Sequence, residues 1–192
     1  MQRERGLLFV LSAPAGTGKT TLVHMLEKEF PHVKKSISFT TRKPRKNEKE
    51  GVDYYFISKE AFEEKLKRGD FLEHAKVFDH YYGTSKEHVE KKLKEKIDLF
   101  LVIDTQGAAK LREKVEAVFI FLLPPSLEIL EKRLAGRKTE SEREKELRLS
   151  WAKKEMEEAS KYDYKIINDD LEKAYNALRS IVIAEERRKR KT

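Results

Sequence analysis

The sequence predicts one α/β domain in which helices flank a parallel sheet and two insertions interrupt the regular order. Three observations predict this fold. Apolar, β-rich runs alternate with helical patterns, a glycine-rich turn follows the first run directly, and two polar stretches break the alternation. A chain of 192 residues is long enough to bury the core of one such domain.

The first predicted strand, residues 7–11, runs straight into a glycine-rich turn and then a helix. This order points several backbone N–H groups and the positive helix end at one place, where a polyphosphate can bind. Gly16 and Gly18 let the backbone approach an anion without Cβ clashes. Lys19 can reach the β and γ phosphates of a nucleotide, and Thr20 can ligate magnesium.

Two simpler explanations of this segment are a flexible loop and a secretory signal. A merely flexible loop is disfavoured, because residues 19–30 carry the apolar spacing of a helix that Pro31 ends. A secretory signal is suggested by Arg3 and Arg5 before an apolar run, but residues 7–11 are fewer than the roughly 7 apolar residues that such signals need. We therefore expect the segment to belong to the fold.

The rest of the predicted core alternates strands and helices. Further strands are predicted at residues 99–103, 117–123 and 164–167. Helical patterns cover residues 106–114, 126–135, 141–160 and 171–189. This alternation implies a parallel sheet, and no apolar run approaches the length of a membrane span.

Two stretches depart from the alternation. One contains β-rich runs at residues 36–40, 53–57 and 71–78 with two short helical patterns, and it predicts an inserted α+β subdomain. The other, residues 136–144, is polar and dense in Arg, Lys and Glu, as expected of a small lid. We divide the chain into a core of residues 1–35, 96–125 and 150–192, an insertion of residues 36–95, and a lid region of residues 126–149.

The net charge of +8 admits either a nucleic-acid surface or a site for multiply anionic small molecules. Much of the excess lies in residues 187–191, at the end of a predicted helix where the dipole favours cations. We therefore expect no nucleic-acid partner and no membrane association. The chain has no cysteine, which excludes disulfides and thiolate metal sites and favours a cytoplasmic location.

Asp104 directly follows a predicted buried strand. A carboxylate in this place can hold magnesium beside a phosphate-binding loop. An aspartate that only caps the next helix is the alternative.

Three arginines, Arg133, Arg137 and Arg148, flank or occupy the predicted lid. Their guanidinium groups could neutralise the charge on a phosphoryl group in transfer. Charged residues on a solvated helix surface are the alternative for each of them.

Seven segments together resemble the guanylate kinase family nearly from end to end. They are residues 13–21, 36–45, 51–56, 71–73, 81–84, 104–107 and 167–171. The resemblance implies the P-loop nucleoside monophosphate kinase fold. It also implies magnesium-dependent transfer of the ATP γ-phosphoryl group to GMP, giving ADP and GDP.

The resemblance also implies the site residues. ATP would bind Ala13, Pro14, Ala15, Gly16, Thr17, Gly18, Lys19, Thr20, Thr21, Arg133, Arg137 and Asn168. GMP would bind Ser38, Arg42, Arg45, Tyr54, Glu73, Tyr82, Gly83, Thr84 and Asp104. The catalytic residues would be Lys19, Arg42, Arg137 and Arg148, and the metal ligands Thr20 and Asp104.

The chemistry of the GMP residues supports guanine independently. Guanine presents N1–H and N2 amino donors beside the O6 acceptor, so a carboxylate with a hydroxyl, such as Glu73 with Thr84, complements this edge. Pro44 holds residues 42–45 in a non-helical turn, which can bring two arginines to one phosphate.

The chain departs from the family pattern at four positions. Alanine replaces the first glycine of the loop at Ala13 and the usual serine at Ala15. Val102 stands where the family often has an aspartate, and Lys138 where glycine is common. We expect the reaction to survive, because Lys19 and the other charged site residues are retained.

Two rival functions were considered. A catalytically inactive, partner-binding member of the family is disfavoured by the intact Lys19 and Thr20 pair. A kinase of another small phosphorylated acceptor is disfavoured by Glu73 and Thr84. The choice between GMP and dGMP and the oligomeric state are left open.

Overall fold

A parallel five-stranded sheet forms the centre of the molecule. The computed structural model describes residues 3–135 and 142–188, with residues 133–135 and 142–148 by their backbone alone. The sheet contains β1 (Leu8–Ser12), β2 (Val33–Lys35), β7 (Asp98–Val102), β8 (Val118–Leu123) and β9 (Tyr164–Ile167). Its strand order is β2-β7-β1-β8-β9, and every pair is parallel, which confirms the predicted fold class.

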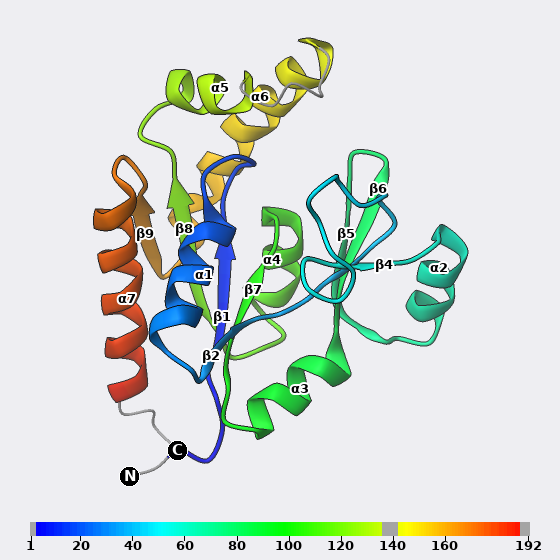
Figure 1. The fold of residues 1–192 in the computed structure, drawn as a ribbon, viewed down its shortest axis with the longest axis vertical. Helices are drawn as coiled ribbons and strands as arrows, with labels where there is room; N and C mark the ends of the chain where they lie inside the picture. Colours follow the sequence, from blue (N-terminus) through cyan, green and yellow to red (C-terminus); the bar gives the residue numbers. More distant parts are fainter. Residues whose placement is uncertain (1–2, 136–141, 189–192) are drawn as a thin grey trace.

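Helices cover both faces of this sheet (Figure 1). One core cluster joins β1 to α1 (Lys19–Glu29) and α7 (Leu171–Arg187), and Phe9 stacks on Phe100 within it at 4.7 Å. A second cluster joins the sheet to α3 (Lys86–Lys94), α4 (Thr105–Leu111) and the 3₁₀ turn η1 (Glu158–Lys161). All five residues of β1 are buried, because helices pack against both faces of this central strand.

The insertion forms its own four-stranded sheet beside the core (Figure 1). Its order is β4 (Tyr55–Phe56), β3 (Phe39–Thr40), β6 (His80–Ser85) and β5 (Phe71–Val77). The helix α2 (Lys59–Lys67) is capped by Ser58, whose hydroxyl accepts a hydrogen bond from the Ala61 amide. It buries Phe62 against Phe71, with 4.5 Å between the ring centroids. Aromatic stacking therefore holds the small subdomain together.

The predicted lid region contains α5 (Leu127–Ala135) and the first half of α6 (Glu142–Glu157), whose second half falls in the predicted core. Both lie above the carboxyl ends of the core strands (Figure 1). Leu130 of α5 and Ala152 of α6 are buried together, with Ala15 of the glycine-rich loop packed against them. Residues 136–141, which include Arg137 and Lys138, lie outside the described part of the chain.

Some element boundaries differ from the sequence prediction. The strand predicted at residues 36–40 is reduced to β3, and the core strand β2 was not predicted because only three residues pair there. The helix predicted at residues 106–114 ends at Leu111. Val89 and Leu93 of α3, within the predicted insertion, pack on the core sheet. None of the helices described is both long and apolar enough to cross a membrane.

Candidate active site

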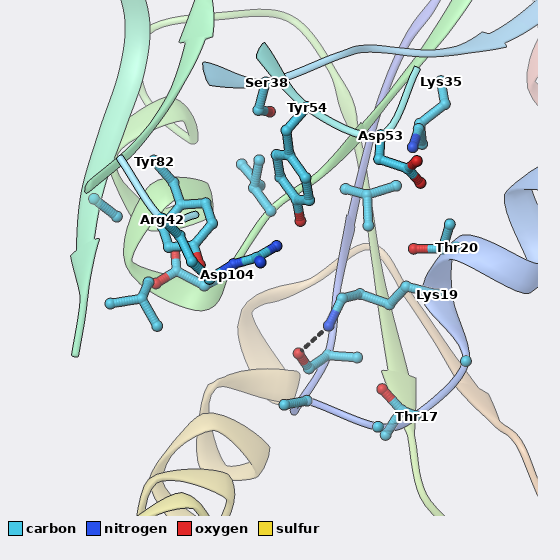
Figure 2. A pocket seen from close by; sticks show the side chains of 18 of the residues that line it. Thr17, Lys19, Thr20, Lys35, Ser38, Arg42, Asp53, Tyr54, Tyr82 and Asp104 are labelled. Carbon is cyan, nitrogen blue, oxygen red and sulfur yellow. Dashed lines mark hydrogen bonds between the residues drawn. The ribbon is translucent and has the colours of Figure 1, made fainter. Parts of the chain in front are cut away.

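A cavity of about 540 Å³ opens where the glycine-rich loop, the insertion and α6 meet. In Figure 2, Thr17, Lys19 and Thr20 lie on one side of it and Ser38, Arg42, Tyr54 and Tyr82 on the other. Most predicted site residues line this cavity: Ala13, Ala15, Gly16, Thr17, Gly18, Lys19, Thr20, Thr21, Ser38, Arg42, Arg45, Tyr54, Glu73, Tyr82 and Asp104. Residues far apart in the sequence are thus brought to one place.

The glycine-rich loop has the conformation that its composition predicts. Gly16 and Gly18 have φ angles of 85° and 91°, in the left-handed region that favours glycine. Lys19 Nζ donates to the Ala13 carbonyl at 2.6 Å, the bond drawn in Figure 2, and to the Pro14 carbonyl at 3.3 Å. The ammonium group is therefore held within the loop, at the start of α1, where an anion would bind.

Asn168 supports this loop without lining the cavity. Its side chain is 5% exposed, and Nδ2 donates to the Thr17 carbonyl at 2.7 Å. A Cβ atom on Gly18 would lie 2.9 Å from the same nitrogen, so the loop and β9 approach closely here. Asn168 thus fixes the backbone of the loop.

Asp104 serves as a helix cap and also faces the cavity. Its Oδ1 accepts a hydrogen bond from the Gly107 amide at 2.9 Å. Asp104 therefore caps α4, which is the alternative role that the sequence allowed, and it also lines the cavity. Burial raises the pKa of Asp104, against the opposing effects of the Gly107 N–H and the Lys19 charge. Thr20 lines the same cavity, and together the two side chains offer the oxygen ligands that magnesium prefers.

Glu73 is a buried carboxylate with one fixed partner. Thr84 Oγ1 donates to Glu73 Oε1 at 2.6 Å, and Ser38 Oγ lies 3.5 Å from the Thr84 hydroxyl. Glu73 is 5% exposed, and burial, opposed by the Thr84 hydrogen bond and aided by the Asp104 charge, raises the pKa of its carboxyl to about 7. Since the Thr84 hydroxyl lies behind the carboxylate, Glu73 rather than Thr84 lines the cavity.

Two local features determine where Glu73 lies. The register of β5 against β6 shifts between Phe71 and Glu73, and such bulges redirect a side chain. A Cβ atom on Gly107 would lie 2.6 Å from Glu73 Oε2, so only glycine leaves room for the carboxylate at α4. Gly83, predicted to contact GMP, is buried against Phe71 and does not line the cavity.

Arg42 is held at the cavity by a carboxylate that the sequence did not single out. Its guanidinium donates to Glu48 Oε1 and to the Lys43 carbonyl, both at 2.8 Å, and lies 5.5 Å from the Tyr54 ring centroid. Glu48 Oε2 also accepts the Arg45 amide at 2.8 Å. Although burial opposes it, the bond to Glu48 raises the pKa of Arg42, so the cation is retained.

Several other lining residues were missed from the sequence: Lys35, Glu48, Asp53, Ala75, Val77, Phe78, Ile103, Trp151 and Glu155. Phe78, at the β5–β6 turn, contacts Trp151 of α6 with ring centroids 5.3 Å apart, which joins the insertion to the core half of α6. Trp151 and Glu155 follow Arg148 by three and seven residues, which places them on the same face of a helix. This spacing could have indicated them from the sequence. The side chains of Arg133 and Arg148 lie outside the described part, as does Arg137.

Comparisons with known proteins identify one family. The family model described as guanylate kinase matches residues 5–185. The chain is 56% identical over 182 residues to a guanylate kinase of Protochlamydia amoebophila, covering 95% of this chain and 92% of that protein. It is 49% identical to one from Caldanaerobacter subterraneus, covering 95% and 89%. A crystal structure of guanylate kinase from Anaplasma phagocytophilum is similar at a TM-score of 0.81 and 37% identity, covering 98% and 90%.

Proposed function

The chain belongs to the guanylate kinase family of ATP:GMP phosphotransferases, and we propose that its cavity joins an ATP half to a GMP half. The observation that carries this proposal is the presence of Lys19 and Glu73 at one cavity, which the glycine-rich loop and the inserted sheet both line. The loop supplies groups for a polyphosphate, and the insertion supplies a buried carboxylate for a base.

In the ATP half, the loop amides and Lys19 bind the β and γ phosphates. The left-handed glycines and the position of Lys19 at the start of α1 support this assignment. The full set proposed for ATP is Ala13, Pro14, Ala15, Gly16, Thr17, Gly18, Lys19, Thr20, Thr21, Arg133, Arg137 and Asn168. Asn168 contributes by holding the loop backbone, as its bond to Thr17 supports.

In the GMP half, Arg42 and Arg45 bind the phosphate with Ser38 and Tyr54. The ionised Glu73 carboxylate accepts hydrogen bonds from guanine N1–H and the N2 amino group. The set proposed to contact GMP is Ser38, Arg42, Arg45, Tyr54, Glu73, Tyr82 and Asp104, whereas Gly83 and Thr84 do not line the cavity and would support these residues from β6. The Thr84 hydroxyl already donates to Oε1, which supports a role in orienting the carboxylate.

Magnesium would be held by Thr20 and Asp104. Their hydroxyl and carboxylate oxygens line one cavity next to Lys19, which fits a hard divalent cation that keeps several water ligands. When bound, magnesium supplies positive charge that neutralises the ATP phosphates.

The transfer itself needs no strong base. The second pKa of a phosphate monoester is near 6, so the GMP phosphate is largely a dianion at neutral pH. One of its oxygens attacks the γ phosphorus of ATP, the bond to the bridging β–γ oxygen breaks, and ADP leaves while GDP forms. Lys19 and Arg42, with Arg137 and Arg148 of the lid, stabilise the charge on the transferring group.

The division into core, insertion and lid is part of the proposal. The separate sheet of the insertion supports it, with α3 at the boundary because its apolar face packs on the core. Closure of residues 36–95 and 126–149 over the substrates would exclude water from the transferring group. We also propose a cytoplasmic location, from the cysteine-free composition alone.

The test of the residue assignments is a phosphoryl-transfer assay with ATP, magnesium and each of GMP, AMP, CMP and UMP. The native protein should prefer GMP, and Glu73→Ala should lose most of this preference. Glu64→Ala, which changes an exposed glutamate of the insertion, is the matched control and should keep the preference. Equal preferences in the native protein and Glu73→Ala would refute the assignment of guanine to Glu73.

A further inference from the structure

A lysine of the core sheet lies at the cavity but belongs to neither proposed substrate set. Lys35, the last residue of β2, lines the cavity together with Thr20 and Asp53. In Figure 2 its side chain extends toward the same part of the cavity as the Asp53 carboxylate, on the side of Thr20. The position therefore offers a further cation to a bound substrate.

The sheet topology explains why the end of β2 reaches the cavity. β2 pairs with β7 and β7 with β1, all in parallel, so the carboxyl ends of these strands lie at one edge of the sheet. Ligands of open α/β sheets bind beyond this edge. The glycine-rich loop follows β1, Asp104 follows β7, and β2 ends at Lys35. Three neighbouring strands thus each bring a polar group to the cavity.

The backbone of Lys35 is fixed to the core. Its N–H donates to Glu27 Oε1 of α1 at 2.8 Å, and the N–H of Ser36 donates to the Phe100 carbonyl of β7 at 2.8 Å. Because side chains alternate along a strand, Lys34 points to the other side of β2 and is exposed, whereas Lys35 is partly buried. The ammonium group of Lys35 is thus held by the core sheet and not by the insertion.

The charge of Lys35 has no fixed partner. Among the side chains that the structure describes, none forms a hydrogen bond or an ion pair with its ammonium group. Val102, which lines the cavity from β7, carries no charge. Arg42, by contrast, is paired with Glu48 at 2.8 Å. A cation that lines a concave site without a partner attracts an anionic ligand.

The phosphate of GMP is the anion that this position fits best. Ser38 and Tyr54 are proposed to bind this phosphate. Ser38 follows Lys35 by three residues, where the chain passes from β2 into the insertion, and Tyr54 directly follows Asp53. Lys35 is therefore close in the chain to one of these hydroxyl groups and lines the same cavity as both.

We propose that Lys35 is a further GMP-binding residue, whose ammonium group contacts the GMP phosphate from the core while Arg42 contacts it from the insertion. The proposal rests on the assignment of this cavity to GMP. A phosphate held from both sides links the insertion to the core sheet, so GMP binding would favour closure of the insertion.

An ion pair between Lys35 and Asp53 is the competing explanation. Asp53 Oδ2 accepts a hydrogen bond from the Lys49 N–H at 2.8 Å, so its carboxylate is fixed within the insertion. If closure only paired these two side chains, Lys35 would hold the insertion in place without contacting the phosphate. The two explanations differ in their result for guanosine, which has the base and the ribose of GMP but no phosphate.

The test measures binding of GMP and of guanosine by calorimetry, without ATP, in the native protein and in variants of Lys35. Lys35→Met should weaken GMP binding roughly 5- to 20-fold, because a partly exposed, charge-assisted contact is lost, and should leave guanosine binding within about twofold. Lys35→Arg keeps the charge and should bind GMP within about threefold of the native protein. Lys34→Met, the exposed neighbour on β2, is the matched control and should bind both ligands as the native protein does.

Two further measurements separate the phosphate of GMP from other partners. Asp53→Asn removes the carboxylate charge, so its affinity for GMP should stay the same or rise, since a negative charge near the phosphate is lost. The KM for ATP should stay within about twofold of the native value in Lys35→Met, because the glycine-rich loop is untouched.

Four outcomes would overturn the proposal. An unchanged GMP affinity in Lys35→Met would show that Lys35 does not contact the phosphate. Equal losses for GMP and guanosine, reproduced by Asp53→Asn, would favour the ion pair. A raised KM for ATP with unchanged GMP affinity would assign Lys35 to the other substrate. A native protein that binds GMP and AMP equally would refute the proposed function itself, whereas the first three outcomes leave that preference intact.

Discussion

The glycine-rich loop, proposed to bind phosphate, and the region around Glu73, proposed as the guanine end of the cavity, differ in the groups that they offer a ligand. The loop relies on its backbone, with Gly16 and Gly18 in left-handed conformations and one lysine held by loop carbonyls. The guanine end relies on side chains, above all the buried Glu73, which Thr84 holds from behind. The loop therefore depends on local sequence, and the guanine end depends on how separate strands and helices pack.

The two ends also differ in their effect on stability. The loop contains no buried acid, whereas Glu73 is enclosed on most sides, and this burial makes its ionised form unfavourable. We infer that the buried carboxylate that the insertion keeps for guanine lowers the stability of the folded protein, and that the loop carries no such destabilising group.

The largest expected effect concerns the loop. Lys19→Met should lower kcat roughly 10²- to 10³-fold, because the charge on the transferring phosphoryl group loses the cation that the loop supplies. GMP affinity, measured by calorimetry, should change little, since the guanine end is untouched. Lys34→Met, an exposed change on β2, is the control. A kcat close to native in Lys19→Met would contradict the proposed division of the cavity.

The next effect concerns stability. Glu73→Gln should raise the free energy of unfolding at pH 8 by about 3 kcal/mol, since the carboxyl has a pKa of about 7 in the folded protein and 4.5 in the unfolded chain. In the native protein, the contribution of the Glu73 carboxyl to the free energy of unfolding is fully present below about pH 4.5 and is lost as the pH rises through 7. Urea denaturation should therefore show that the gain in stability of Glu73→Gln over the native protein is largest at pH 8 and shrinks toward pH 4.5. An equal gain at pH 8 and pH 4.5 would exclude ionisation of Glu73 as its cause.

The affinity for GMP should change with pH as the Glu73 carboxyl titrates. Guanine requires the ionised acceptor, so affinity in metal-free buffer should be constant above about pH 7 and fall up to tenfold per unit below it. The GMP phosphate also titrates near pH 6. Glu73→Gln separates the two effects, because it retains only the contribution of the phosphate. If GMP affinity depended on pH in the same way in the native protein and in Glu73→Gln, ionisation of Glu73 would not be required for GMP binding.

A smaller effect is expected at Glu48. Glu48→Gln weakens the bond that holds Arg42 and leaves the loop intact, so the KM for GMP should rise roughly 3- to 10-fold while the KM for ATP stays unchanged. Glu63→Gln, on the exposed side of α2, provides the comparison. Equal increases for both substrates would mean that Glu48 maintains the whole cavity and not the GMP half.

This contrast explains what the sequence could predict. The loop was predictable in detail, since strand, glycines, lysine and helix are adjacent in the chain and backbone geometry follows from them. Glu73 and Arg42 were assigned through the resemblance and do line the cavity. Glu48 and Glu155 were missed, because Glu48 becomes important only when a turn closes on Arg42 and Glu155 reaches the cavity only in the folded chain. The short strand β2 was missed because its three residues pair only through the tertiary fold.

The central claim is that the Glu73 carboxylate recognises the guanine edge. The most direct test is the ratio of kcat/KM for GMP to that for inosine monophosphate, which lacks only the 2-amino group, in the native protein and in Glu73→Gln. One hydrogen bond to a charged acceptor predicts a native ratio of roughly 10 to 100. We predict that this ratio falls to within about threefold of unity in Glu73→Gln. An unchanged ratio in the variant would contradict the claim.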